Sequence, residues 1–306
     1  MKTLLNTSLD PHFNMAFDSY VLEHTDFEGF YLWQNKPSVI IGLNQSAYAE
    51  VNLPFIDANG IELVRRVSGG GAVYHDLANL NYTFVGYEDG PARVAEALRK
   101  LGAPAELTGR NDIMVGGRKC SGYAKRLAGD RIFVHGTLMF NVNLETLLNA
   151  LSTPGSKLSA AGVQSVRSKV ANLKEYLTYC TIQEFQAALH NALGGEAPEP
   201  LPAEQIAEIE QIASSKFRSW EWRYGHSPKT DFRSTQKFSC GTVTASYSIK
   251  RGVLSEVTFE GDFIGAKPAS ELAALLKGKR LHDIESLPVS DWFDSLTTKE
   301  FMTLFE

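Results

Sequence analysis

Residues 65–76 read "RRVSGGGAVYHD", and this stretch decides how the chain around it is interpreted. Two arginines lead directly into three glycines, although each glycine costs backbone entropy on folding and adds no side-chain packing. Such a loop needs positive φ angles, or its backbone must lie against something else. The guanidinium groups of Arg65 and Arg66 indicate that this something is an anion, such as a phosphate or a carboxylate.

The loop does not have the sequence signature of either of two common phosphate-binding loops. The chain contains no G-x-x-x-x-G-K-[ST] pattern, which excludes a Walker A loop. Gly69, Gly70 and Gly71 have no further glycine at the spacing of a dinucleotide fingerprint, and a strand rather than a helix is predicted after them. Successive N–H groups in a glycine turn still form an anion nest. A glycine-rich hairpin without a ligand is the alternative.

The residues around the loop predict a mixed α/β fold. Apolar residues at helical spacing follow the capping residues Asp10 and Thr181, and Glu184 completes a capping box with Thr181. Gly116 and Gly117 predict a tight hairpin turn. Strands are expected on both sides of the glycine loop and after the hairpin, over residues 30–34, 38–42, 61–67, 79–87 and 131–142.

The end of the chain predicts a smaller α+β unit. Strand patterns begin at Phe238 and turn near Gly252, and short helices are expected near 269–277 and 298–305. By composition, the segment most typical of a linker is "GGEAPEPLP", residues 194–202.

Composition excludes several classes of protein. The chain has 306 residues, 43% hydrophobic and 21% charged, and its net charge of −5 argues against a nucleic-acid binder. No apolar run is long enough to span a membrane, and the N-terminus does not resemble a signal peptide. Three scattered cysteines do not predict a disulfide framework. We expect a cytoplasmic monomer that binds neither nucleic acid nor membrane.

Polar residues near the two glycine turns are candidates for chemistry. Lys119 follows the Gly116–Gly117 turn, where it could hold a carboxylate and a phosphate together while both are negative. Asn111 and Asp112 could bind Mg²⁺ or a ribose, or only cap a turn. His75 and His135 are possible acid–base groups, but structural hydrogen bonding is the favoured interpretation because no Ser/His/Asp pairing is legible.

Together, several motifs resemble lipoate–protein ligase A of the biotin/lipoate ligase superfamily. The motifs are "RRVSGGGAVYHDLANLNY", "GRNDIMVGGRKCSGYA", "HGTLMFNVNL" and "KLSAAGVQSVRSKVANL", and the resemblance covers roughly residues 5–235. It implies an α/β (α+β) catalytic domain of the class II synthetase type, with mixed sheets and flanking helices, over residues 1–228. A small α+β accessory domain is then expected over 229–306, although composition alone places the break at 194–202.

The resemblance also implies an activity. Lipoate and ATP would give lipoyl-adenylate and pyrophosphate, with Mg²⁺ helping pyrophosphate to leave. The amine of a lysine on a lipoyl domain would then attack the adenylate to form an amide. Implied acceptors are the acyltransferase subunits of 2-oxo-acid dehydrogenases and the glycine cleavage H protein. The adenylate must be shielded from water, which predicts a mobile loop at 116–130 or 156–170.

The resemblance implies roles for the residues that match the motifs of the family. Lys119 matches the catalytic lysine that bridges the acyl carbonyl and the phosphate, and Asp112 is the candidate metal ligand. The matched ATP and adenylate contacts are Arg66, Gly71, Ala72, Val73, Tyr74, Asn111, Asp112 and Lys119. The matched lipoate contacts are Ser68, Gly69, Gly70, Lys119 and His135.

The chain departs from the family pattern at two positions, and three other functions are alternatives. Leu43 stands where relatives often carry a basic residue, and Cys120 stands where an apolar residue is expected. A cysteine-dependent octanoyl or lipoyl amidotransferase would need Cys120 as its nucleophile, and nothing legible activates that thiol. Biotin–protein ligase has a different glycine–arginine signature. A carrier-binding module without catalysis is disfavoured by the intact Arg66, glycine run and Lys119.

Overall fold

The computed structural model describes residues 1–108, 111–151, 169–227 and 229–305. Its contacts divide the chain into two compact units. The first unit contains residues 1–43 and most of the chain between Phe55 and Ser219, while the second contains residues 44–54 and the chain from Trp220 onward. Each unit has its own hydrophobic core.

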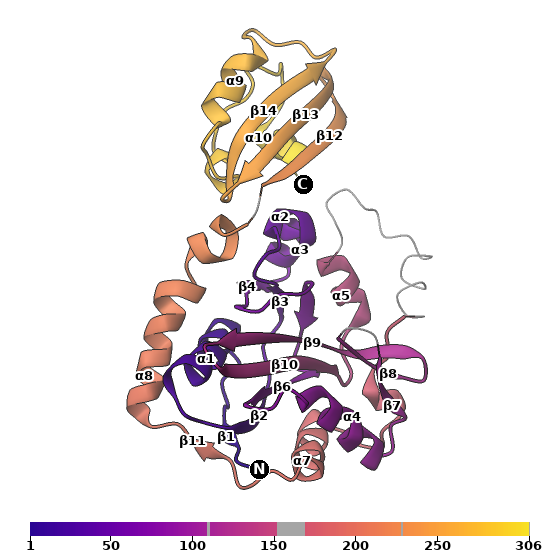
Figure 1. Cartoon of the computed structure of the whole chain (residues 1–306). Helices are drawn as coiled ribbons and strands as arrows, with labels where there is room; N and C mark the ends of the chain where they lie inside the picture. The colour runs from indigo at the N-terminus through magenta and orange to yellow at the C-terminus, as the bar shows by residue number, and fades with distance from the viewer. Residues whose placement is uncertain (109–110, 152–168, 228, 306) are drawn as a thin grey trace. The chain divides into compact units, whose positions relative to one another are not determined.

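A six-stranded antiparallel sheet forms the centre of the first unit (Figure 1). Its strand order is β2-β6-β10-β9-β8-β7, so that β2 and β7 are the edges. The predicted glycine turn joins β8 to β9, and both Gly116 and Gly117 have positive φ, at 54° and 75°. The strands are β2 (Gly29–Trp33), β6 (Asn79–Val85), β7 (Ala105–Thr108), β8 (Asp112–Val115), β9 (Arg118–Ala128) and β10 (Arg131–Met139).

A second, three-stranded sheet carries the glycine loop. Strand β3 (Ser38–Ile41) pairs in parallel with β4 (Glu62–Arg65) and antiparallel with β5 (Val73–His75). The loop connects β4 to β5, and a strand follows it as predicted. The mixed sheets with flanking helices confirm the predicted α/β fold class.

Helix α1 (Pro11–His24) begins as the sequence predicts. Asp10 caps it by accepting hydrogen bonds from the N–H groups of His12 and Phe13, and Pro11 stands at the first helical position. The helix is buried along most of its length, which brings polar residues such as Asp18 into the interior. Those polar groups need partners there, because an unpaired buried polar group is costly.

Further helices complete the first unit. The predicted capping box of Thr181 and Glu184 is present at the start of α7. Helix α8 lies alongside α1 (Figure 1) and continues into a π-helical turn, Ala213–Phe217. The helices are α3 (Leu53–Ala58, which begins in the second unit), α4 (Gly90–Lys100), α5 (Leu144–Ala150), α7 (Ile182–Ala192) and α8 (Ala203–Ile212).

The linker-like composition of residues 194–202 does not mark a break between units. Strand β11 (Glu199–Pro200) lies in this segment and pairs in parallel with the N-terminal strand β1 (Leu4–Leu5). The main-chain N–H of Glu196 also donates to the carbonyl of Met1. The segment is therefore tied into the first unit, and its proline and glycine content reflects a surface connection.

The second unit is a three-stranded sheet with short helices. Its strands, in the order β12-β13-β14, are antiparallel, and β13 and β14 form the predicted hairpin at Gly252. Strand β12 was not predicted, because it ends at Phe238, where the expected strand patterns begin. The elements are α2 (Ala47–Glu50), β12 (Thr230–Phe238), β13 (Gly241–Lys250), β14 (Val253–Gly261), α9 (Ala269–Leu276) and α10 (Thr298–Met302).

Among the described residues, no helix is long and apolar enough to cross a bilayer.

Candidate active site

Local backbone geometry explains the need for glycine in the loop between β4 and β5. Gly70 has a φ of 92°, a conformation that L side chains rarely adopt. Its carbonyl oxygen approaches Gly42 so closely that a Cβ atom on Gly42 would lie 2.1 Å from it. Gly69 and Gly71 face open space, with no atom within 4 Å of a Cβ added at either position.

The side chain of Arg66 holds this loop from inside. It is 6% exposed, and its N–H groups donate to the Ser68 hydroxyl and to the carbonyls of Ile40, Gly69 and Gly71. No ion pair joins Arg66 to an acidic side chain of the described residues, and burial lowers its pKa to about 10. A buried guanidinium that is still charged at neutral pH and has no countercharge favours an anion beside it.

An inner cavity of about 110 Å³ opens beside the loop. One end is buried and mostly apolar, with Met15, Trp33 and Ile40 in its wall. The other end is open and contains Lys119. The remaining lining residues are Arg66, Gly70, Gly71, Ala72, Val73, His75, Asn81, Asn111, Gly122, Tyr123, Ala124, His135, Gly136 and Thr137.

An outer cavity of about 400 Å³ adjoins the inner one. The two share Gly70, Asn111, Tyr123 and Ala124 as lining residues. The backbone of the glycine loop therefore borders both spaces. This arrangement can hold a molecule with an apolar part in the inner cavity and a larger polar part in the outer one.

Lys119 reaches the open end from strand β9. A register shift opposite it, between Ile113 and Met114 of β8, changes the local direction of the side chains. Its ammonium lies 2.7 Å from a carboxylate oxygen of Asp112, and its side chain is 40% exposed. A Cβ atom on Gly122 would lie 3.2 Å from that ammonium, so glycine leaves room for the lysine.

The sequence did not predict a chain of buried hydrogen bonds that lies behind the loop. The Nδ1 atom of His135 lies 2.8 Å from a carboxylate oxygen of Asp18, and its Nε2 atom lies 2.6 Å from the Ser68 hydroxyl. The other oxygen of Asp18 accepts from the hydroxyls of Tyr31 and Thr83. The carboxylate therefore holds the Nδ1 proton, and Nε2 accepts from Ser68. The Ser/His/Asp arrangement that was not legible in the sequence is present.

Comparison with known proteins fits this geometry. The family model for the lipoyl protein ligase A/B catalytic domain matches residues 10–194, and the model for the bacterial lipoate protein ligase C-terminus matches residues 227–305. Lipoate-protein ligase LplJ of Bacillus subtilis is 37% identical, covering 96% of each chain. Lipoate–protein ligase 1 of Staphylococcus aureus is 40% identical, covering 94% of this chain and 92% of its own.

This chain belongs to the lipoate–protein ligase family. Solved ligases share its fold. A bi-partite lipoate protein ligase of Thermoplasma acidophilum, studied with its E2 lipoyl domain, has a TM-score of 0.65 at 26% identity and covers 74% of this chain and 96% of its own. A lipoate-protein ligase A bound with ATP has a TM-score of 0.62 at 27% identity, covering 74% and 98%.

Most of the residues predicted for the ligase site meet at the two cavities. Arg66, Asn111, Lys119, His135 and residues 70–73 line the inner one, and Gly69 lines the outer one. Three predicted residues are placed differently. Ser68 contacts Arg66 and His135 behind the wall, Asp112 pairs with Lys119, and Tyr74 is 5% exposed and lines neither cavity.

The expected mobile loop is not found at 116–130. Residues 118–128 form strand β9, which pairs with β8 and β10. Of the other expected segment, 156–170, residues 156–168 lie outside the described part of the chain. Among the described residues no group of three or more possible metal ligands occurs, so Asp112 stands alone as a candidate.

The environment of Cys120 does not favour a thioester mechanism. The residue is fully buried in the main core, its S–H donates to the carbonyl of Ile113, and burial raises its pKa to about 12. The reactive form of cysteine is the thiolate, and this thiol stays protonated. Cys120 therefore packs as a small apolar residue, and the amidotransferase alternative loses its nucleophile.

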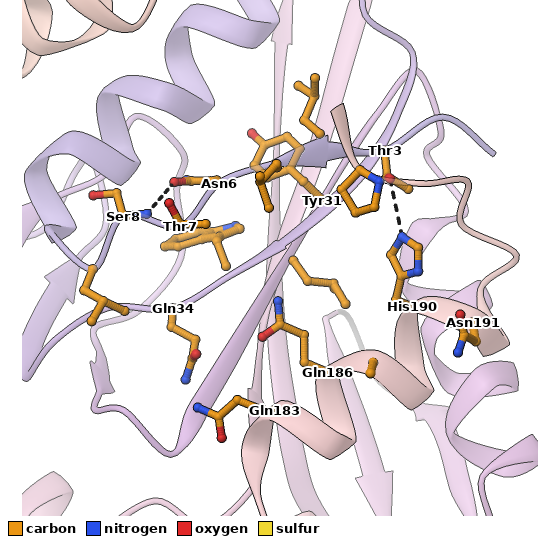
Figure 2. A pocket seen from close by; sticks show the side chains of 17 residues that line it. Thr3, Asn6, Thr7, Ser8, Tyr31, Gln34, Gln183, Gln186, His190 and Asn191 are labelled. Carbon is orange, nitrogen blue, oxygen red and sulfur yellow. Dashed lines mark hydrogen bonds between the residues drawn. The ribbon is translucent and has the colours of Figure 1, made fainter. Parts of the chain in front are cut away.

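A larger cavity, of about 490 Å³, lies elsewhere in the ligase, between β1, β2 and α7. Figure 2 shows the amide side chains of Gln183, Gln186 and Asn191 there, with the ring of His190 next to Thr3. None of the described residues that line this cavity is a lysine, arginine, aspartate or glutamate. It cannot neutralise two anions, so the smaller inner cavity is the better candidate for the reaction.

Proposed function

We propose that this protein activates lipoate with ATP and transfers the lipoyl group to a lysine of lipoyl domains, using the paired cavities beside the glycine loop. The main support for this proposal is the buried charge of Arg66 under the loop, which has no acidic partner among the described residues, together with Lys119 at the open end of the inner cavity. Lipoate carboxylate attacks the α-phosphate of ATP and releases pyrophosphate. The acceptor lysine amine then attacks the lipoyl carbonyl and releases AMP.

In this mechanism, catalysis depends mainly on positive charge that stabilises two reacting anions. Two anions must meet in the first step, and Lys119 reduces their repulsion by lying between carboxylate and phosphate. Asn111, which lines both cavities, contacts the adenylate together with the backbone of Gly71, Ala72 and Val73 in the inner cavity, and Tyr74 anchors strand β5. His135 and Gly70 line the inner cavity beside the lipoyl chain, Ser68 supports His135 from behind, and Gly69 borders the outer cavity.

The chemistry of the site fits Mg²⁺ bound mainly through substrate phosphates. Asp112 places a carboxylate beside Lys119 at the open end, and Mg²⁺ is commonly held by one or two carboxylates together with phosphate oxygens. Asp112 would hold the ion there. When bound, Mg²⁺ neutralises charge on the departing pyrophosphate. The chain itself positions Lys119 through the same carboxylate.

The family name supports lipoyl-domain proteins as acceptors. We propose the acyltransferase subunits of 2-oxo-acid dehydrogenases and the glycine cleavage H protein, a monomeric state and a cytoplasmic location. We also propose a catalytic domain over residues 1–228 and an accessory domain over 229–306. The match of the C-terminal family model to residues 227–305 supports that boundary.

The test is pyrophosphate release by the full chain with ATP, Mg²⁺ and lipoate, followed by the mass of an added apo lipoyl domain. We expect pyrophosphate release and a lipoyl mass gain that both require ATP. Acyl transfer from an octanoylated carrier without ATP would contradict the proposal and support the amidotransferase alternative.

A further inference from the structure

Two polar side chains at the buried end of the inner cavity each have one nitrogen atom without a hydrogen-bond partner. His75 and Asn81 both line it and are 3% and 1% exposed. The Nε2 atom of His75 and the Nδ2 atom of Asn81 have no hydrogen-bond partner in the structure. The rest of this end is apolar, with Met15, Trp33 and Ile40. Buried polar groups are usually hydrogen-bonded to protein, ordered water or a ligand, so these two nitrogens are available to a molecule in the cavity.

A chain of hydrogen bonds determines which nitrogen of the His75 ring carries the proton. The Nδ2 group of Asn14 donates to the main-chain carbonyls of Ser8 and Gln34, which fixes the orientation of that amide. The same Nδ2 group faces the Oδ1 atom of Asn35, so the Nδ2 group of Asn35 is turned to His75. An amide nitrogen can only donate, so the Nδ1 atom of His75 accepts and its proton lies on Nε2.

His75 therefore offers a neutral donor. Burial lowers its pKa to about 3, and the nearby Arg66 guanidinium acts in the same direction. The ring also packs edge-on against Trp33, with centroids 6.4 Å apart. Its position and tautomer are set before any ligand arrives, which makes its N–H a preorganised contact.

We propose that His75 Nε2–H, with Asn81 beside it, recognises the dithiolane sulfur atoms of lipoate and makes the enzyme prefer lipoate to octanoate. This inference rests on the proposed function, in which the carboxylate lies at Lys119 and the other end of the lipoyl chain reaches the buried end. A thioether-like sulfur is a weak hydrogen-bond acceptor. The terminal methyl of octanoate accepts nothing and leaves both donors buried without partners.

The size of the preference follows from that difference. A site built around a hydrogen bond discriminates strongly against an analogue that cannot form it, and a weak sulfur acceptor reduces the effect. We expect kcat/KM for lipoate to exceed that for octanoate by about tenfold or more. Both substrates present the same carboxylate to Lys119, so the ratio reports on the buried end alone.

The kinetic test compares pyrophosphate release with lipoate and with octanoate in wild type, His75→Phe and Asn81→Leu. Both changes keep the bulk of the side chain and remove the donor. We expect the preference to fall about fivefold or more in His75→Phe, because lipoate turnover drops and octanoate turnover is retained. His24→Phe, at an exposed position at the end of α1, is the matched control and keeps the wild-type ratio.

A second measurement does not depend on a folded variant. ¹⁵N NMR of labelled wild-type protein reports the tautomer of His75 directly, and we expect a protonated Nε2 whose signal shifts with lipoate and not with octanoate. An Nδ1–H tautomer, or an unchanged substrate ratio in His75→Phe, overturns the inference while the ligase function stands. Absence of pyrophosphate release with lipoate in wild type overturns the proposed function itself.

Discussion

At the scale of single residues, Lys119 is the side chain on which the proposed chemistry depends most. We expect Lys119→Ala to lower the rate of pyrophosphate release by two orders of magnitude or more, because Lys119 is the cation that the proposal places between carboxylate and phosphate. The fold is retained, since the side chain is 40% exposed. Lys100→Ala is the matched control on helix α4, where the lysine pairs with Glu96 at the surface and lines neither cavity. Wild-type turnover by Lys119→Ala would remove the central assignment.

Asp18 acts on the loop through His135 as a positioning residue. In Asp18→Asn, the amide oxygen can keep the hydroxyls of Tyr31 and Thr83, and the amide nitrogen is turned to His135. That nitrogen donates, so the imidazole proton moves to Nε2 and the bond from Ser68 is reversed. We expect kcat/KM to fall by about tenfold or more.

The tautomer of His135 separates this effect from a loss of folding. We expect Asp18→Asn to keep wild-type circular dichroism while ¹⁵N NMR shows the imidazole proton of His135 moved from Nδ1 to Nε2. Reduced helix content with an unchanged tautomer would show that Asp18 serves the fold alone.

The same residues show why part of the site could not be read from the sequence. Arg66, the glycines and Lys119 lie in recognisable motifs, and their patterns were legible. Asp18 lies on a helix whose spacing indicated only core packing, far along the chain from Ser68 and His135. Folding brings these three residues together, and no local sequence pattern predicts such a contact.

At the scale of elements, the glycine loop depends on Gly70 more than on its neighbours. We expect Gly70→Ala to destabilise the protein by about 1–2 kcal/mol and to reduce activity, because φ is positive there and the added Cβ would lie 2.9 Å from the Arg66 guanidinium. Gly69→Ala, whose Cβ meets open space, is the matched control and stays within about 0.5 kcal/mol of wild type in urea unfolding. Equal stability of the two variants would contradict this account.

Elements with a local signal, such as a cap, a glycine turn or an apolar strand pattern, were predictable, and a short strand that depends on a distant partner was not. Asp10 and the Thr181–Glu184 box mark helix starts because their side chains bond to nearby N–H groups. Gly116 and Gly117 mark a turn because both need positive φ. Strand β11 is short and proline-rich, so its partner in β1 makes it a strand rather than any propensity of its own.

At the scale of the whole molecule, the neutral His75 couples folding to pH. Its pKa is about 3 in the folded protein and about 6.5 in the unfolded chain. Between these values the unfolded chain binds the extra proton, so stability is complete above about pH 6.5 and falls as the pH drops toward 3. From pH 7.5 to pH 5 this group removes about 2 kcal/mol from the free energy of unfolding.

The comparison of wild type with His75→Phe isolates that contribution, because both proteins share every other titrating group. Urea unfolding of each at pH 7.5 and pH 5 gives two losses of stability, and we expect the loss in wild type to be larger by about 2 kcal/mol. Equal losses would mean that the imidazole takes up its proton without unfolding. That result would require an acceptor beside Nδ1, where the added proton binds, and would contradict the orientation of Asn35 that makes Nε2 the donor.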